Sequence, residues 1–153
     1  MKIPYCPTIW IDQTTGSLDY VLRPEIELIV HGPTESVIYS ALVDTGSDDV
    51  VLPSSLGRYV GASLAPSPRH AQAFGGSVLE FAVGEVELEL KADGDSFRWR
   101  TEVKFLEFSE AADETLVVGH KGFLEFFTAI FDGHEAVLTL TPNADLPITR
   151  SVE

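Results

Sequence analysis

Apolar and polar side chains alternate along the middle of the chain in two stretches. From 85 to 90, a valine and two leucines alternate with glutamates, and from 97 to 105 apolar residues and a threonine alternate with charged ones. Asp93 and Gly94 lie between the two stretches. A period of two is typical of a strand with one buried face, and Asp-Gly favours a two-residue hairpin turn. The pattern therefore predicts a β-hairpin that begins at Gly84 and ends near 105.

The charged residues of this hairpin predict its register. If Asp93-Gly94 centres the turn, Glu89 faces Arg98 and Glu87 faces Arg100. Opposite charges directly across two strands contribute about 0.2–1 kcal/mol each. We interpret the pairs as fixing the register, because the facing glutamates disfavour the alternative of an arginine-lined anion site.

The other apolar runs are short, rich in β-branched and aromatic residues, and interrupted by glycine or proline, which favours further strands. These strands are expected over 8–12, 18–30, 37–43, 115–119, 129–132 and 136–140. Pro24 lacks a backbone N–H, so it is expected at an edge or bend of the second strand. Gly75-Gly76 predicts the tip of a hairpin over 69–81.

Two short segments have helical character. Phe123, Leu124 and Phe127 form one apolar stripe, which predicts a helix over 121–128. Residues 54–57 are expected to form a loop or a short helical turn.

Composition and charge narrow the classes of function. Hydrophobic residues make up 44% of the 153 residues, enough for a single domain over 1–153 with a buried core. The net charge of −14 argues against nucleic acid and anionic membranes as partners. Cys6 is the only cysteine, so no internal disulfide is possible. Because neither a signal-peptide pattern nor an apolar run of about 20 residues is evident, we expect a soluble, cytoplasmic protein.

The stretch Asp44-Thr45-Gly46-Ser47 carries the candidate chemistry. It follows the apolar run Ala41–Val43 and precedes Asp48 and Asp49. A strand that ends in this way presents a carboxylate at a tight turn, where glycine allows close backbone approach and hydroxyls can hold the carboxylate. Asp44 is therefore the candidate catalytic residue. The alternative is a turn aspartate with satisfied hydrogen bonds.

The order of these motifs resembles that of the retropepsin-like aspartic proteases, single-domain relatives of pepsin and of retroviral proteases. Residues 43–49 match the active-site loop of that family, and Phe74-Gly75-Gly76 lies where the family has its flap. Leu116–Gly119 and the following Phe123-Leu124 resemble its second glycine-ended strand and its helix. The resemblance extends from about 25 to 140 and implies an all-β fold, a closed antiparallel barrel with one short helix near the C-terminus.

The family resemblance implies an aspartic endopeptidase, which needs two catalytic aspartates. The chain has one Asp-Thr-Gly, whereas Asp93 and Asp132 precede glycines outside the Thr-Gly-Ser context. We therefore expect a homodimer in which Asp44 of each copy meets its partner across a twofold axis. Two adjacent carboxylates share a proton, and the charged one activates a water that attacks the peptide bond. Neither a metal nor another cofactor is expected.

The resemblance also implies roles for the neighbouring residues. Thr45 would brace the two loops across the dimer, and the Gly46 carbonyl with the amides near Asp48 would grip a peptide substrate as an extended strand. Ser47 completes the loop. The flap at 74–76 would close over the substrate and exclude water.

Two features depart from the family pattern. His120 lies where retroviral relatives often have an arginine that pairs with the second aspartate of the loop. A contact between His120 and Asp48 would depend on pH, unlike an arginine pair. The segment 146–153 has little apolar alternation, although retroviral dimers join through their termini. Either the dimer interface differs, or the isolated chain is a monomer.

Other chemistries fit the sequence less well. Asp44, Asp48 and Asp49 lack the alternating spacing and the later glutamate of a calcium loop, and the four histidines lack zinc spacing. Cys6 has no nearby histidine that would mark it as a nucleophile. The alternative function is a catalytically silent, protease-like module that binds extended peptides or self-assembles.

Overall fold

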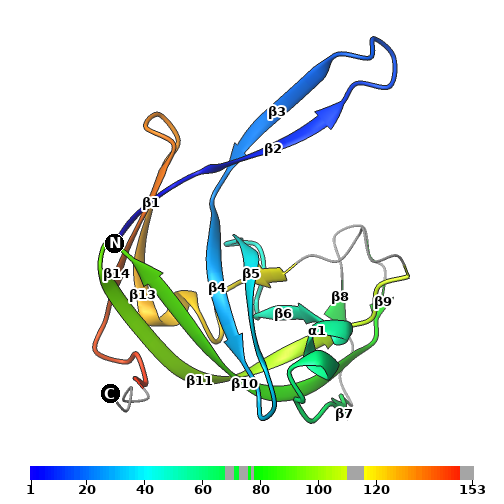
Figure 1. Ribbon diagram of the computed structural model, residues 1–153, viewed down its shortest axis with the longest axis vertical. Coiled ribbons are helices and arrows are strands. Elements are labelled where there is room, and N and C mark those ends of the chain that lie inside the picture. The colour runs from blue at the N-terminus through cyan, green and yellow to red at the C-terminus, as the bar shows by residue number, and fades with distance from the viewer. Residues whose placement is uncertain (68–70, 73–75, 77, 110–115, 149–153) are drawn as a thin grey trace.

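The computed structural model describes residues 1–67, 71–72, 76, 78–109 and 116–148, and most of them lie in strands (Figure 1). The strands are β1 (Lys2–Pro4), β2 (Cys6–Ile11), β3 (Leu18–Arg23), β4 (Glu25–His31), β5 (Ser36–Val43), β6 (Val51–Pro53), β7 (Ala65–Pro66), β8 (Ala71–Gln72), β9 (Val78–Leu79), β10 (Phe81–Ala92), β11 (Asp95–Leu106), β12 (Leu116–Val118), β13 (Phe127–Asp132) and β14 (Val137–Pro142). The helices are α1 (Ser54–Tyr59) and the 3-10 turn η2 (Leu124–Phe126).

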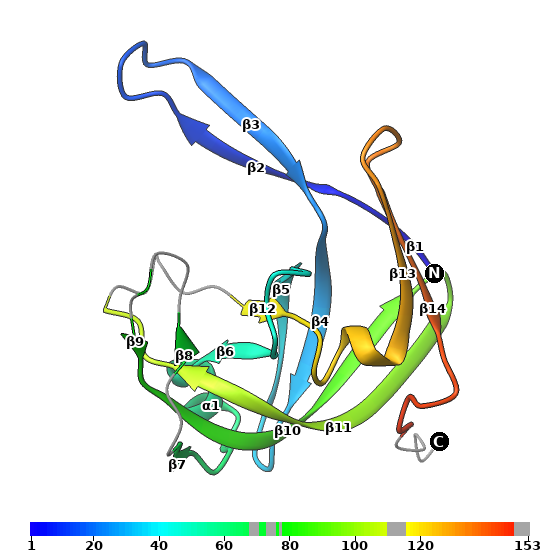
Figure 2. The ribbon, with the colours of Figure 1, turned by 180° about the vertical axis from the view of Figure 1, so that it is seen from behind.

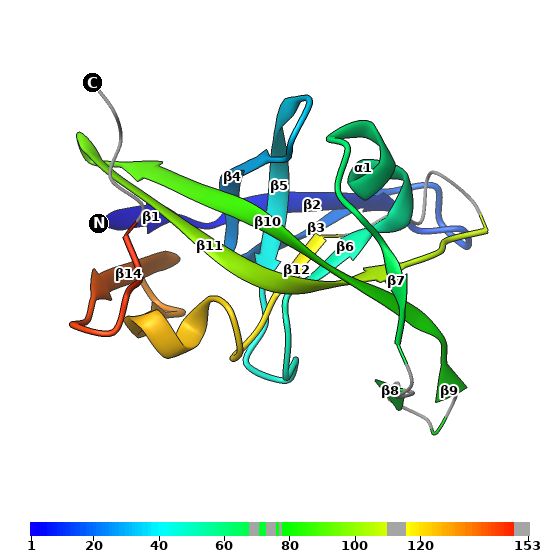
Figure 3. The same ribbon diagram turned by 90° about the horizontal axis from the view of Figure 1, so that it is seen from below.

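Six strands close into a barrel, which confirms the expected all-β fold class. They follow the order β11-β6-β12-β5-β4-β10, and pairing of β10 with β11 closes the ring (Figures 1 and 3). Most pairs are antiparallel, but β6 pairs in parallel with β11, and β12 with β5. Alternate residues of these strands point inward, so the barrel encloses the core. Its largest fully buried side chains include Trp99, Phe105, Phe123, Ile26, Leu28, Leu52, Leu88 and Leu90.

The predicted central hairpin is confirmed with its register. Glu87 lies opposite Arg100 and Glu89 opposite Arg98. Asp93 (φ 52°) and Gly94 (φ 82°) both adopt the positive φ that a two-residue hairpin turn requires. The expected pair of Arg100 with Glu87 is present at 3.7 Å, and the Arg98 guanidinium also pairs with Glu87.

The buried Glu89 instead belongs to a network of side chains that links β10 to β4. Its side chain contacts His31 Nε2 at 2.8 Å, Ser96 Oγ at 2.9 Å and Lys91 Nζ at 3.0 Å. Burial opposes ionisation of Glu89, but the hydrogen bonds from Lys91, His31 and Ser96 outweigh it and lower its pKa to about 2. The carboxylate is therefore a stabilising element of the barrel wall.

We expect replacement of Glu89 by glutamine to lower the free energy of unfolding at neutral pH by about 1–3 kcal/mol. A depressed pKa stabilises the fold above the unfolded-state value of 4.5, and this stabilisation is lost as the pH falls from there toward about 2. Urea unfolding of both proteins across this range should show the difference shrinking. The matched control is Glu85→Gln, which removes an exposed ion pair and should cost about 0.5 kcal/mol or less. A difference that is constant with pH would contradict this role.

The single strand predicted over 18–30 is wrong: the chain bends at Pro24, which lacks an N–H, and the segment is divided into two strands of different sheets. Before the proline, β3 pairs with β2, and after it β4 pairs with β5 and β10. The β2–β3 hairpin leaves the barrel and projects from it (Figures 1 and 2).

Of the two helical segments, the first is confirmed and the second needs correction. The short helical turn expected over 54–57 is the start of the α-helix α1. Its Gly57 is required because a Cβ there would lie 2.5 Å from the Phe105 ring. The helix predicted over 121–128 is reduced to η2, because Gly122 has a φ of 91° and Phe127 already pairs with β14. In the described part of the chain, no helix is long and apolar enough to cross a membrane.

A second sheet lies beside the barrel, with the order β1-β14-β13. The predicted last hairpin is confirmed, with Ala129 opposite Leu140. Phe123 and Phe127 pack on Trp99, whose indole N–H donates to the Gly122 carbonyl at 2.9 Å. These contacts attach the second sheet to β11.

Candidate active site

Strand β5 places Asp44 at one end of the barrel. The Val43 amide donates to the Pro24 carbonyl at 2.9 Å, and the Asp44 amide donates to the Val118 carbonyl at 3.0 Å. Val43 and Val118 are register partners in the parallel pair of β5 and β12. Backbone hydrogen bonds on both sides therefore fix the point at which the carboxylate leaves the sheet.

The turn after Asp44 orients its carboxylate. Oδ1 accepts a hydrogen bond from the Gly46 amide at 2.8 Å, and the Asp44 carbonyl accepts one from the Ser47 amide at 3.2 Å. The Ser47 hydroxyl donates to the Asp49 carbonyl at 2.9 Å, so it holds the loop rather than the carboxylate. Among the described residues, Oδ2 receives no hydrogen bond. Asp44 is half-buried, and a fixed carboxylate with one open oxygen is suited to binding a water or a second carboxyl group.

A second loop, residues 119–121, supports the first. Three amides of this loop donate to carbonyls of the Asp44 loop: Gly119 to Asp49 at 3.1 Å, His120 to Ser47 at 3.0 Å and Lys121 to Asp48 at 2.8 Å. A Cβ at Gly119 would overlap the Ser47 carbonyl oxygen and lie 2.7 Å from that of Asp49. Glycine is needed here because the two backbones are in contact.

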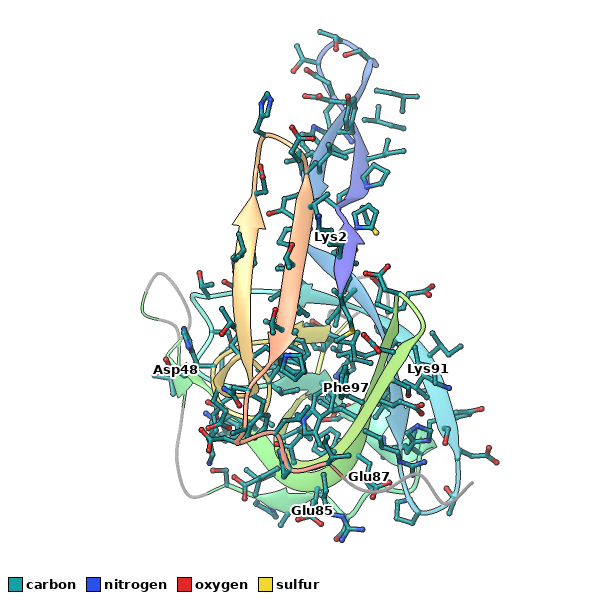
Figure 4. The ribbon with its side chains drawn as sticks, turned by 90° about the vertical axis from the view of Figure 1, so that its left-hand side faces the viewer. Lys2, Asp48, Glu85, Glu87, Lys91 and Phe97 are labelled. Atoms are coloured by element: carbon teal, nitrogen blue, oxygen red, sulfur yellow. The ribbon has the colours of Figure 1, made fainter. Side chains whose placement is uncertain are left out.

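His120 contacts the Asp44 loop at a backbone carbonyl and not at the Asp48 carboxylate. Its Nε2 donates to the Thr45 carbonyl at 2.9 Å. Contact with the Asp48 carboxylate is absent from the hydrogen bonds and ion pairs of the described residues. Asp48 is exposed and lies at the periphery of the molecule (Figure 4). The histidine therefore supports the backbone of the turn.

Lys104 forms an ion pair with the Asp44 loop, and the sequence analysis did not predict it. Its ammonium pairs with the Asp49 carboxylate and lies 4.5 Å from the centre of the Phe81 ring. The pair forms because β6, which follows Asp49, runs in parallel with β11. The ion pair of Asp49 with Lys104 therefore holds the loop to the barrel. The local sequence does not predict this pair, because the two residues are far apart in the chain.

The candidate flap is described only in part. Strands β8 and β9 pair in antiparallel fashion, with Ala71 opposite Leu79, as expected for a hairpin. Phe74 and Gly75 lie outside the described residues. Gly76 is exposed and has a φ of 84°.

The other Asp-Gly sequences are engaged elsewhere. Asp93 Oδ2 accepts from the Lys2 amide at 2.6 Å, at the tip of the central hairpin. Asp132 Oδ1 accepts from the His134 and Glu135 amides, each at 3.0 Å, at the tip of the last hairpin. In the described part of the chain, neither the Asp93 nor the Asp132 carboxylate contacts Asp44. Neither of them can therefore serve as a second aspartate beside Asp44 within one chain.

The comparisons with known proteins give a structural likeness but no match by sequence. No protein-family model matches the sequence, and neither does any curated protein. Among solved structures, the chain is similar to the EIAV protease complexed with the inhibitor HBY-793, with a TM-score of 0.44. The match has 18% sequence identity and covers 64% of this chain and 82% of that chain. The function therefore has to be inferred from the residues of this chain.

Proposed function

We propose that the chain is an aspartic endopeptidase that acts as a homodimer. The observation that carries this proposal is the geometry of Asp44, a half-buried carboxylate at the end of a strand with Oδ1 held by the Gly46 amide at 2.8 Å. Two loops joined by three backbone hydrogen bonds hold it there. A fold that needs only a turn aspartate has no evident use for this second supporting loop.

The proposed reaction uses one Asp44 from each copy. Two carboxyl groups in contact share one proton, because ionising both at short distance is unfavourable. Ionised Asp44 of one copy takes a proton from a bound water, whose oxygen attacks the carbonyl carbon of the peptide bond. Protonated Asp44 of the other copy donates a hydrogen bond to the carbonyl oxygen, and a proton then passes to the leaving nitrogen.

The neighbouring residues have positioning roles in this proposal. Thr45 and Gly46 are exposed, so the Thr45 side chain can reach a second copy and the Gly46 carbonyl can reach an extended peptide. Asp48 is likewise exposed, whereas Ser47 holds the turn through its hydroxyl. The hairpin of β8 and β9 would cover the bound peptide, in the flap role proposed for Phe74, Gly75 and Gly76.

The test is cleavage of a mixed peptide library between about pH 4 and pH 7. We expect cleavage inside peptides, faster below neutral pH because the shared proton is retained more easily there. A peptide mimic of the tetrahedral intermediate should inhibit it. Binding of extended peptides without cleavage at any of these pH values would instead support the silent peptide-binding module.

A further inference from the structure

The N-terminal hairpin, residues 6–23, is an arm without a core of its own. In the described part of the chain, β2 and β3 form a sheet of two strands that no third strand joins. The arm extends away from the barrel, toward the same side as the tip of the β13–β14 hairpin (Figures 1, 2 and 4). A two-stranded hairpin alone in water is marginally stable, so an arm of this kind gains from a partner surface.

The register of the arm separates an apolar face from a mixed one. Cross-strand partners share a face, and successive residues of a strand alternate between faces. One face carries Pro7, Ile9, Ile11, Leu18, Tyr20 and Leu22, and we name it the apolar face of the arm. The other face carries Cys6, Thr8, Trp10, Asp19, Val21 and Arg23.

The apolar face of the arm is exposed along its whole length. Leu18 is 74% exposed, and Ile9 and Tyr20 are each 63% exposed. A sheet face that is entirely apolar normally packs on a core, and monomeric proteins rarely leave more than a few hundred Å² of contiguous apolar surface uncovered. The alternation of side chains on the arm is typical of a sheet with one packed face. Within one chain, no described residue covers the apolar face of the arm.

The root of the arm lies beside Asp44. Pro24, which follows the arm, accepts the hydrogen bond from the Val43 amide, one residue before Asp44. The Glu25 carboxylate accepts from Thr8 Oγ1 at 3.2 Å and from Ser40 Oγ at 3.1 Å, which ties the arm to β5. The arm therefore leaves the barrel at the end where Asp44 emerges.

We propose that the apolar face of the arm docks on a second copy of this chain and holds the two Asp44 loops together. This inference rests on the proposed function, in which a site with one Asp-Thr-Gly is incomplete without that copy. In a twofold dimer, the arm of each chain would contact the other chain, so the same surface of both copies would lie in the interface.

Charge also favours the arm as the contact between two copies. The chain has a net charge of −14, so two copies repel each other over most of their surface. The arm carries only Asp12, Asp19 and Arg23 as charged residues. An uncharged apolar face offers attraction where this repulsion is weakest.

The test compares the oligomeric state of three proteins by sedimentation velocity over a range of concentrations. We expect the wild type to dimerise, and Ile9→Ser combined with Tyr20→Ser to raise the dimer dissociation constant at least about 100-fold. These residues are cross-strand partners on the apolar face of the arm. The control, Val21→Ser on the mixed face, should change the constant about threefold or less.

The double substitution could unfold the arm, so a second measurement uses hydrogen exchange in the wild-type protein. In the wild type, amides of 6–23 should become protected as the concentration rises through the dissociation constant. A wild-type dimer that the double variant leaves intact, with arm amides unprotected, would overturn the docking role and leave the protease proposal standing. An arm-dependent dimer that cleaves no peptide would support the docking role and contradict the protease. A wild type that stays monomeric would overturn both.

Discussion

Replacing Asp44 by asparagine is expected to abolish peptide hydrolysis and to leave the fold intact. The asparagine Oδ1 can still accept the hydrogen bond from the Gly46 amide, so the turn keeps its geometry. The amide cannot take a proton from water, and loss of acid–base catalysis typically costs about 10²–10⁴-fold in rate. We expect a fall of at least about 10³-fold in kcat, measured with the best peptide from the library.

The control for this variant is Asp132→Asn, which removes the same charge from an exposed turn. The substituted side chain would keep the turn hydrogen bonds from the amides of His134 and Glu135, because its Oδ1 is still an acceptor. The kcat of this control should match that of the wild type. Hydrolysis that survives in the Asp44→Asn protein would assign the activity to another residue or to a contaminant.

Replacing Gly119 by alanine is expected to be the most damaging change to the site outside Asp44. The new methyl group would overlap the Ser47 carbonyl and crowd that of Asp49, and both are backbone atoms that cannot turn aside. Overpacking of this kind costs about 1–3 kcal/mol of stability. Displacement of the Asp44 loop by about 1 Å would lower kcat about 10²-fold.

Gly133→Ala is the matched control, because a Cβ at that glycine has no atom within 4 Å. Thermal unfolding and kcat should both stay near the wild-type values. If Gly119→Ala behaves in the same way, the two loops do not depend on their close contact, and the supporting role of the second loop is wrong.

Local patterns predicted the parts of the fold that local residues determine. The period of two and the Asp93-Gly94 turn gave the central hairpin and its register. Pro24 indicated a bend, but not that β3 and β4 would belong to different sheets. The partners of Glu89 could not be predicted, because His31 comes from β4, 58 residues away in the sequence. The helix predicted over 121–128 is shorter than expected because Gly122 adopts a φ of 91°, which the apolar stripe alone did not indicate.

The candidate site was predictable in part for the same reason. The Asp44 turn and the strand ending at Gly119 have recognisable sequences, and the structure places them in contact. The ion pair of Asp49 with Lys104 depends on the parallel pairing of β6 with β11, which joins segments far apart in the chain. For His120 the sequence raised a contact with Asp48 as one option, and the ring nitrogen reaches the Thr45 carbonyl instead.

The most direct test of the shared site mixes wild-type and Asp44→Asn chains in equal amounts and allows the dimers to exchange. If each site needs Asp44 from both copies, random pairing leaves about half of the wild-type chains with an inactive partner. Hydrolysis per wild-type chain should then fall to about half, and further as the variant is added in excess. Hydrolysis per wild-type chain that stays constant at every mixing ratio would contradict a site built from two copies of Asp44.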